Sequence, residues 1–145
     1  MSGGQSLLVI DSNIWAYFFD STLPEHEMVK QPVKQAVEEE DILMTTVIQL
    51  ELLHYLIKRL GPIQGGEKLD IFLNYPFKVD VLDGDLIAGT AEVLKRHLHL
   101  GIGARDASII ASMRRKNVTK LLTHDKALKR IEEIEVIDPL EQDSS

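Results

Sequence analysis

The stretch that decides the fold is Leu7-Leu8-Val9-Ile10-Asp11-Ser12-Asn13-Ile14-Trp15, near the start of the chain. It begins with four apolar residues without alternation, a pattern typical of a strand buried on both faces of a parallel sheet. Asp11 then stands at the carboxyl end of that strand, where open α/β sheets form their ligand crevice. A carboxylate in such a place must be solvated, paired with a cation or bound to a metal ion.

Strands and helices are expected to alternate along the rest of the chain. The candidate strands cover residues 7–11, 41–45, 77–82, 118–123 and 135–137. The candidate helices cover residues 14–19, 24–40 (kinked or split at Pro32), 46–60, 64–74, 85–98, 104–116 and 126–130. Ser12 or Asn13 is the expected cap of the first helix. This alternation predicts an α/β fold, a three-layer α/β/α sandwich with a mainly parallel central sheet.

The length and composition indicate a single domain. We expect it to span residues 1–145, with a core of about 7–138, a disordered lead-in at 1–6 and a disordered tail at 139–145. The chain has no cysteine, which excludes disulfides and cysteine-based zinc sites and fits a reducing compartment. No apolar run is long enough to span a bilayer, and the N-terminus lacks the features of a signal peptide. We therefore expect a soluble, cytoplasmic protein that does not enter membranes.

The net charge of −7 argues against an extended basic surface that binds nucleic acid by releasing counterions. It remains compatible with a nuclease whose active site is a cluster of carboxylates, because bound metal ions reverse the charge locally.

Three further acids have unusual surroundings. Glu51 stands between leucines in the most apolar helix, Asp106 opens a helix, and Asp125 follows the apolar end of a strand. Each has an ordinary structural alternative. Glu51 could pair at the rim with Arg59 or a lysine, Asp106 could cap its helix, and Asp125 could cap a strand-to-helix turn.

These acids can meet at one edge of the sheet. Asp11 and Asp125 both follow parallel strands, whose carboxyl ends share an edge, and the helix that carries Glu51 begins at that edge. Asp106 joins them if the preceding loop and helix fold over the edge. Clustered carboxylates repel one another unless they are protonated or neutralised by cations. Oxygen ligands without sulfur suit Mg²⁺ or Mn²⁺, and such a site can hydrolyse a phosphodiester.

Four motifs occur in order along the chain: Val9-Ile10-Asp11-Ser12-Asn13, the lone acid Glu51 on an apolar helix, Arg105-Asp106-Ala107-Ser108-Ile109-Ile110-Ala111, and Leu121-Leu122-Thr123-His124-Asp125. With these motifs, residues 7–138 resemble the PIN-domain family and, within it, the VapC-like ribonuclease toxins.

The resemblance implies a Mg²⁺- or Mn²⁺-dependent endoribonuclease. Asp11, Glu51, Asp106 and Asp125 would bind one or two metal ions, and a hydroxide generated there would attack an RNA phosphate. Asn13 and Thr123 match polar catalytic positions that would orient the ligands or the water. The expected partners are a single-stranded or loop RNA substrate, a second copy of the chain in a homodimer, and an antitoxin protein that fills the active-site groove.

Other interpretations remain open at this point. A PIN-domain scaffold or RNA-processing subunit would bind RNA or protein with little activity of its own. A response-regulator receiver also gathers aspartates at strand ends, but it needs adjacent acids where this chain has Ser12 and Asn13. Arg105 is the best single candidate for contacting an RNA phosphate. His54 and His124 could join the site or be ordinary packing and turn residues.

The aromatic residues after the first strand also have two interpretations. Trp15, Tyr17, Phe18 and Phe19 could stack on RNA bases. Aromatic side chains this close to a buried strand more commonly belong to the core or to a dimer interface.

Overall fold

A five-stranded parallel sheet organises the protein, whose computed structural model describes residues 7–141. The strand order is β3-β2-β1-β4-β5, with β1 in the centre. The strands are β1 (Leu7–Ile10), β2 (Asp41–Thr45), β3 (Lys78–Asp80), β4 (Lys120–Leu122) and β5 (Glu135–Ile137). The expected lead-in at residues 1–6 and the last part of the expected tail, residues 142–145, lie outside the described residues.

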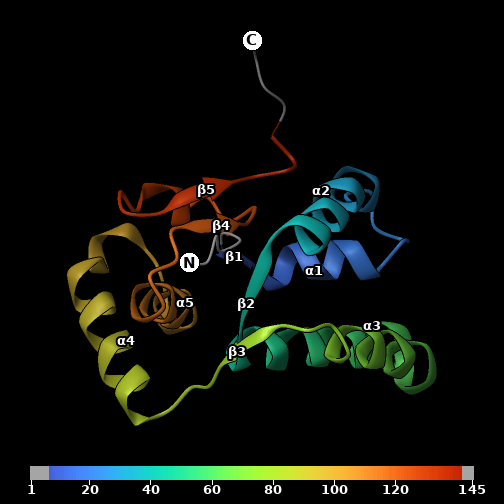
Figure 1. The fold of residues 1–145 in the computed structure, drawn as a ribbon, viewed down its shortest axis with the longest axis horizontal. Coiled ribbons are helices and arrows are strands. Elements are labelled where there is room, and N and C mark those ends of the chain that lie inside the picture. Colours follow the sequence, from blue (N-terminus) through green and yellow to red (C-terminus); the bar gives the residue numbers. More distant parts are fainter. Residues whose placement is uncertain (1–6, 142–145) are drawn as a thin grey trace.

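Helices cover both faces of the sheet, which confirms the predicted α/β/α sandwich (Figure 1). One face carries α1 (Ser12–Phe19), α2 (His26–Glu39) and α3 (Thr46–Leu73). The other face carries α4 (Gly84–Arg96) and α5 (Ala104–Arg115). Two short 3₁₀ helices, η1 (Leu98–Leu100) and η2 (Leu128–Arg130), lie in connections.

The order of the strands reverses direction between β1 and β4. From β1 the chain moves to β2 and then to β3, with its helices on one face. It then crosses the other face through α4 and α5 and returns to the far side of β1 as β4. The direction of travel therefore reverses between β1 and β4. In open α/β sheets the ligand crevice forms at such a switch point, outside the carboxyl ends of the strands.

Two helices begin or continue differently from the sequence-based expectation. Asp11, rather than Ser12 or Asn13, caps α1, because its extended backbone lets its carboxylate accept the Ser12 N–H at 2.7 Å. Pro32 does not split α2, which runs unbroken from His26 to Glu39. Proline has no N–H, so position 32 donates no hydrogen bond within that helix.

The expected helices 46–60 and 64–74 form one element, α3, with a break at Gly61. Gly61 has a φ of +89°, a conformation that L side chains rarely adopt. After the break, the second half of α3 lies so close to the first that a Cβ on Gly65 would be 2.1 Å from the carbonyl oxygen of Leu56. Gly65 therefore allows the two halves to pack, which brings Phe72 into the core.

Replacing Gly65 should weaken this packing. We expect Gly65→Ala to lower the free energy of unfolding by about 1–3 kcal/mol, the usual cost of overpacking. Gly66→Ala is the matched control, since nothing lies within 4 Å of a Cβ there. It should be neutral or stabilise the helix by up to about 1 kcal/mol. Urea unfolding followed by circular dichroism measures both, and equal effects of the two substitutions would contradict this account of the break.

The last described residues remain attached to the core. Leu140 is partly buried against it, and its N–H donates to Asp138 at 2.9 Å. Among residues 7–141, no helix is long and apolar enough to cross a lipid bilayer.

Candidate active site

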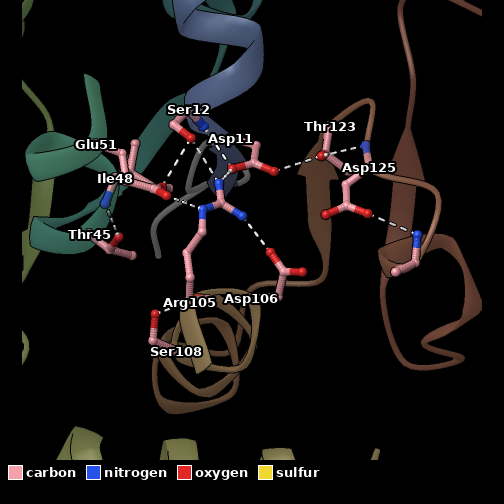
Figure 2. A network of polar contacts seen from close by, with 11 residues as sticks. Asp11, Ser12, Thr45, Ile48, Glu51, Arg105, Asp106, Ser108, Thr123 and Asp125 are labelled. Atoms are coloured by element: carbon pink, nitrogen blue, oxygen red, sulfur yellow. Dashed lines mark hydrogen bonds and ion pairs between the residues drawn. The ribbon is translucent and has the colours of Figure 1, made fainter. Parts of the chain in front are cut away.

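Three acids from distant parts of the chain surround one arginine. The guanidinium of Arg105 donates through Nη2 to Asp11, through Nε to Glu51 and through Nη1 to Asp106 (Figure 2). Asp11 ends β1, Glu51 lies on α3, and Asp106 lies in the first turn of α5. The fold therefore brings three of the four expected acids together at the carboxyl edge of the sheet.

The charge of Arg105 is strongly held at this position. Burial opposes the charged form of the guanidinium, but the carboxylates of Asp11, Glu51 and Asp106 outweigh it and hold the pKa above its ordinary value. The side chain is still 30% exposed, so it lies at the mouth of the site. The sequence predicts that Arg105 contacts an RNA phosphate. In the structure its guanidinium lies among the acids.

Ser12 is a member of this network that the sequence analysis considered only as a helix cap. Its Oγ donates to Glu51 at 3.0 Å and accepts from Arg105 at 2.8 Å. The available signal was a hydroxyl directly after the acid that ends β1. A hydroxyl in the first turn of α1 lies next to Asp11 and can therefore contact the side chains that surround it.

Asp11 is the most deeply buried of the acids and is saturated with donors. It has no exposed surface, and it accepts from the Ser12 N–H and from Arg105 on one oxygen. Its other oxygen accepts from the Thr123 hydroxyl at 2.7 Å. Thr123, also fully buried, accepts in turn from the Asp125 N–H at 3.0 Å. Thr123 thus links the ends of β1 and β4.

Asp125 both caps a turn and lies beside the site. One oxygen of its carboxylate accepts the Ala127 N–H at 2.9 Å, so the expected turn cap is present. The carboxylate lies across the site from Glu51, on the same side as Asp106 (Figure 2). Burial, followed by the charges of Asp125 and Asp11, raises the pKa of Asp106 to about 6 against the opposing charge of Arg105. The charges of Asp125 and Asp11 therefore both act on Asp106.

The structure also decides between the alternatives for the other two acids. Glu51 pairs with Arg105 and not with Arg59. Asp106 does not cap α5, because the cap residue is Gly103 and the Asp106 carboxylate faces Arg105. Both side chains are directed into the site.

Asn13 lies beside the site without joining its network. Its Oδ1 is buried and has no hydrogen-bond partner among residues 7–141. The side chain lines the same groove as Glu51. The expected role in orienting ligands or water thus has an available acceptor atom but no contact with the four acids.

The groove next to the acids has a volume of about 770 Å³ and lies between α1 and α3. Its lining is mostly apolar, and Leu50 and Leu53 are 66% and 41% exposed. Tyr55 closes part of the wall by donating to Asp20 at 2.7 Å, and burial together with this bond raises the pKa of Tyr55 to about 12. His54 also lines the groove.

The other candidate residues lie away from the acids. The His124 Nδ1 is 2.9 Å from the buried carboxylate of Asp138. Trp15 and Phe19 are buried, and Phe18 packs against the same core, which supports the core interpretation for these three residues. Tyr17 also packs against the core but lines the groove as well.

The donors at this site fit a divalent cation in their chemistry. Four carboxylates and one guanidinium leave a formal charge of −3 in a largely buried site, and every candidate ligand atom is oxygen, as Mg²⁺ and Mn²⁺ prefer. Burial first, and then the neighbouring charges of Asp125 and Asp11, raise the pKa of Asp106. Within residues 7–141, however, the acidic side chains do not converge on a common point as a bound ion would require. Three of them surround the guanidinium of Arg105 instead.

Comparisons with known proteins agree with this architecture. Residues 8–134 match the family model described as the PIN domain. A search of curated protein sequences finds no match.

Several solved toxin–antitoxin structures have a similar fold. VapBC2 from Rickettsia felis, bound to promoter DNA, is 20% identical, with a TM-score of 0.72 over 90% of this chain and 97% of that one. VapC20 from Mycobacterium tuberculosis, described as a Sarcin-Ricin loop cleaving toxin, is 20% identical, with a TM-score of 0.66 over 79% and 86%. DNA-bound VapBC from Salmonella typhimurium is 15% identical, with a TM-score of 0.72 over 92% and 98%. The TM-scores show a shared fold, and at identities this low the comparisons show the fold alone.

Proposed function

Because the chain belongs to the PIN-domain family, we propose that it is a metal-dependent endoribonuclease and the toxin of a toxin–antitoxin pair. The observation that carries the proposal is the gathering of Asp11, Glu51 and Asp106 around one cation, with Asp125 beside them, at the switch point of the sheet. Four carboxylates opposed by one guanidinium leave excess negative charge, and Asp11, Glu51, Asp106 and Asp125 would be the residues that hold a divalent cation there.

In this proposal the four acids hold one or two Mg²⁺ or Mn²⁺ ions. A divalent cation there supplies the Lewis acidity that activates water and offsets the charge on the phosphate during hydrolysis. Thr123 orients the Asp11 carboxylate, and Ser12 orients that of Glu51. The Asn13 side chain lines the groove beside Glu51, and its buried Oδ1 has no hydrogen-bond partner among residues 7–141.

RNA is the proposed substrate, in a single-stranded or loop form. VapC20, whose fold this chain shares, is described as cleaving the Sarcin-Ricin loop, an RNA element. The groove reaches the site at Glu51 and Ser12, where an extended strand could lie against the edge of the acid cluster.

Metal removal tests the proposed function. We expect RNA cleavage with Mg²⁺ or Mn²⁺, its loss with EDTA, and its return when excess metal is added back. The substrate is a labelled, structured RNA, and separation of its products on a gel measures cleavage directly. Equal cleavage with and without EDTA would exclude the metal-dependent reaction.

A scaffold or RNA-processing subunit is the second candidate function. The observation in its favour is that Arg105 forms ion pairs with three of the acids that would bind the metal. A scaffold would bind RNA in a gel-shift assay and release no metal-dependent products from the same RNA.

We also propose an antitoxin partner and a homodimer. The exposed Leu50 and Leu53 offer an antitoxin segment apolar contacts beside the acids, and several solved neighbours are toxin–antitoxin complexes.

A separate group of exposed apolar side chains near β3 and the start of α4 offers a surface to a second copy: Val79, Val81, Leu82 and Ile87. Light scattering of the purified chain gives its mass, and a monomer at micromolar concentration would contradict the homodimer.

A further inference from the structure

We propose that Arg105 is an exchangeable internal cation: it neutralises the acids in the metal-free protein and leaves them when a divalent ion binds. The inference rests on the proposed function for the metal-binding role of the acids. It adds a competitor, supplied by the chain itself, to that site.

The first argument is that Arg105 uses the oxygens that a metal would need. Its three nitrogens contact one carboxylate oxygen each on Asp11, Glu51 and Asp106. The remaining oxygens of Asp11 and Glu51 already accept from Thr123 and Ser12. A guanidinium and a metal ion therefore compete for the same ligand atoms, and two cations in contact would also repel each other.

The second argument is that helix α5 does not favour a positive charge at the position of Arg105. It is the second residue of α5, and the positive end of a helix dipole disfavours a cation in the first turn. The three acids and the Ser12 hydroxyl, which accepts from Nη2 at 2.8 Å, hold the side chain. Since it is 30% exposed, it can turn outward without crossing the packed interior.

The third argument concerns balance of charge. One guanidinium among four carboxylates leaves the site with a formal charge of −3, and its three nitrogens contact only three of the four acids. A divalent ion neutralises more of it from the same position. Exchange is therefore favoured when metal is available, and Arg105 is then released at the mouth of the site, where an RNA phosphate would approach.

Metal binding without RNA tests the exchange. We expect Arg105→Gln to bind Mn²⁺ at least about tenfold more tightly than the wild type, because one opposite charge at contact distance shifts a carboxylate equilibrium by roughly a factor of ten or more. Arg105→Lys, which keeps the charge, should stay close to the wild type. Electron paramagnetic resonance of free Mn²⁺ gives each dissociation constant.

Arg115→Gln is the matched control. Arg115 lies on the same helix and pairs with Asp80 at 2.7 Å and Asp83 at 2.9 Å, outside the four-acid site. It should lower stability without changing the affinity for Mn²⁺. Equal tightening by Arg105→Gln and Arg115→Gln would indicate a general effect of net charge and overturn the exchange.

A second readout uses the unaltered protein. In the ¹⁵N–¹H spectrum, the Arg105 Nε–H signal, assigned by its absence from Arg105→Gln or Arg105→Lys, should move toward the position of a solvated arginine as Mg²⁺ is added. The Arg115 signal should not move. An unmoved Arg105 signal at saturating Mg²⁺ would overturn the exchange.

Failure of the exchange differs from failure of the proposed function. Equal Mn²⁺ affinity of wild type and Arg105→Gln leaves the metal site standing and removes only the competition. No binding of Mn²⁺ to either protein removes the metal site itself, and with it the proposed reaction.

Discussion

Asp11→Asn should lower RNA cleavage at least about 100-fold while the protein stays folded. Loss of even an outer partner of a metal ligand costs roughly 10–100-fold in affinity or activity, and Asp11 is proposed as a ligand itself. The fold should survive because the new amide oxygen can still accept from the Ser12 N–H and Arg105. The Thr123 hydroxyl can rotate to accept from the new amide N–H₂.

The measurement is the initial rate of RNA cleavage at saturating Mn²⁺, with circular dichroism as the check on folding. Asp85→Asn is the matched control, because Asp85 is an exposed acid in the first turn of α4. It makes the same chemical change outside the site and should leave the rate unchanged. Full activity of Asp11→Asn would show that cleavage does not use this site and would favour a contaminating nuclease or a scaffold.

Trp15→Ala should have the largest effect on stability, lowering the free energy of unfolding by about 3–5 kcal/mol. Trp15 is fully buried, with its ring centroid 5.2 Å from that of Phe72 and 5.6 Å from that of Phe77. It thus joins α1, directly after Asp11, to the end of α3. Small domains are stable by only about 5–15 kcal/mol, so the substitution removes a large share.

Two controls separate lost packing from other causes. Trp15→Phe keeps much of the volume and should cost less, particularly because the indole N–H has no hydrogen-bond partner among the described residues. Ile63→Ala removes an apolar side chain that is 76% exposed and should change stability by no more than about 0.5 kcal/mol. Urea unfolding compares all three, and a Trp15→Ala cost as small as that of Ile63→Ala would contradict the assigned core.

The sequence predicted the sheet and its helices because their signals are local or topological. The uninterrupted run 7–10 indicated burial on both faces, and parallel strands necessarily share their carboxyl edge, which places Asp11 and Asp125 together. Glu51 followed from the start of its helix at that edge. Even the break in α3 was visible, since glycine and proline at positions 61 and 62 interrupt a helical pattern.

The contacts inside the site could not be predicted in the same way. The approach of Asp106 depends on how α4 and α5 pack, and Figure 1 shows α5 end-on while α4 lies across the view. The direction of the Arg105 side chain depends on which acids surround it in three dimensions. Adjacent positions on a helix point in different directions, so the neighbourhood of Arg105 and Asp106 in sequence does not reveal their ion pair.

The central position of β1 also has a consequence for how the protein is synthesised. Asp11 waits for Arg105, 94 residues later, and for Thr123, 112 residues later, before its contacts can form. At about 5–20 residues per second, translation takes roughly 5–20 s to supply Thr123 after Asp11. Until then the nascent chain has neither a complete site nor a partner for one edge of β1. The proposed site therefore cannot be complete on a nascent chain until Thr123 has been made.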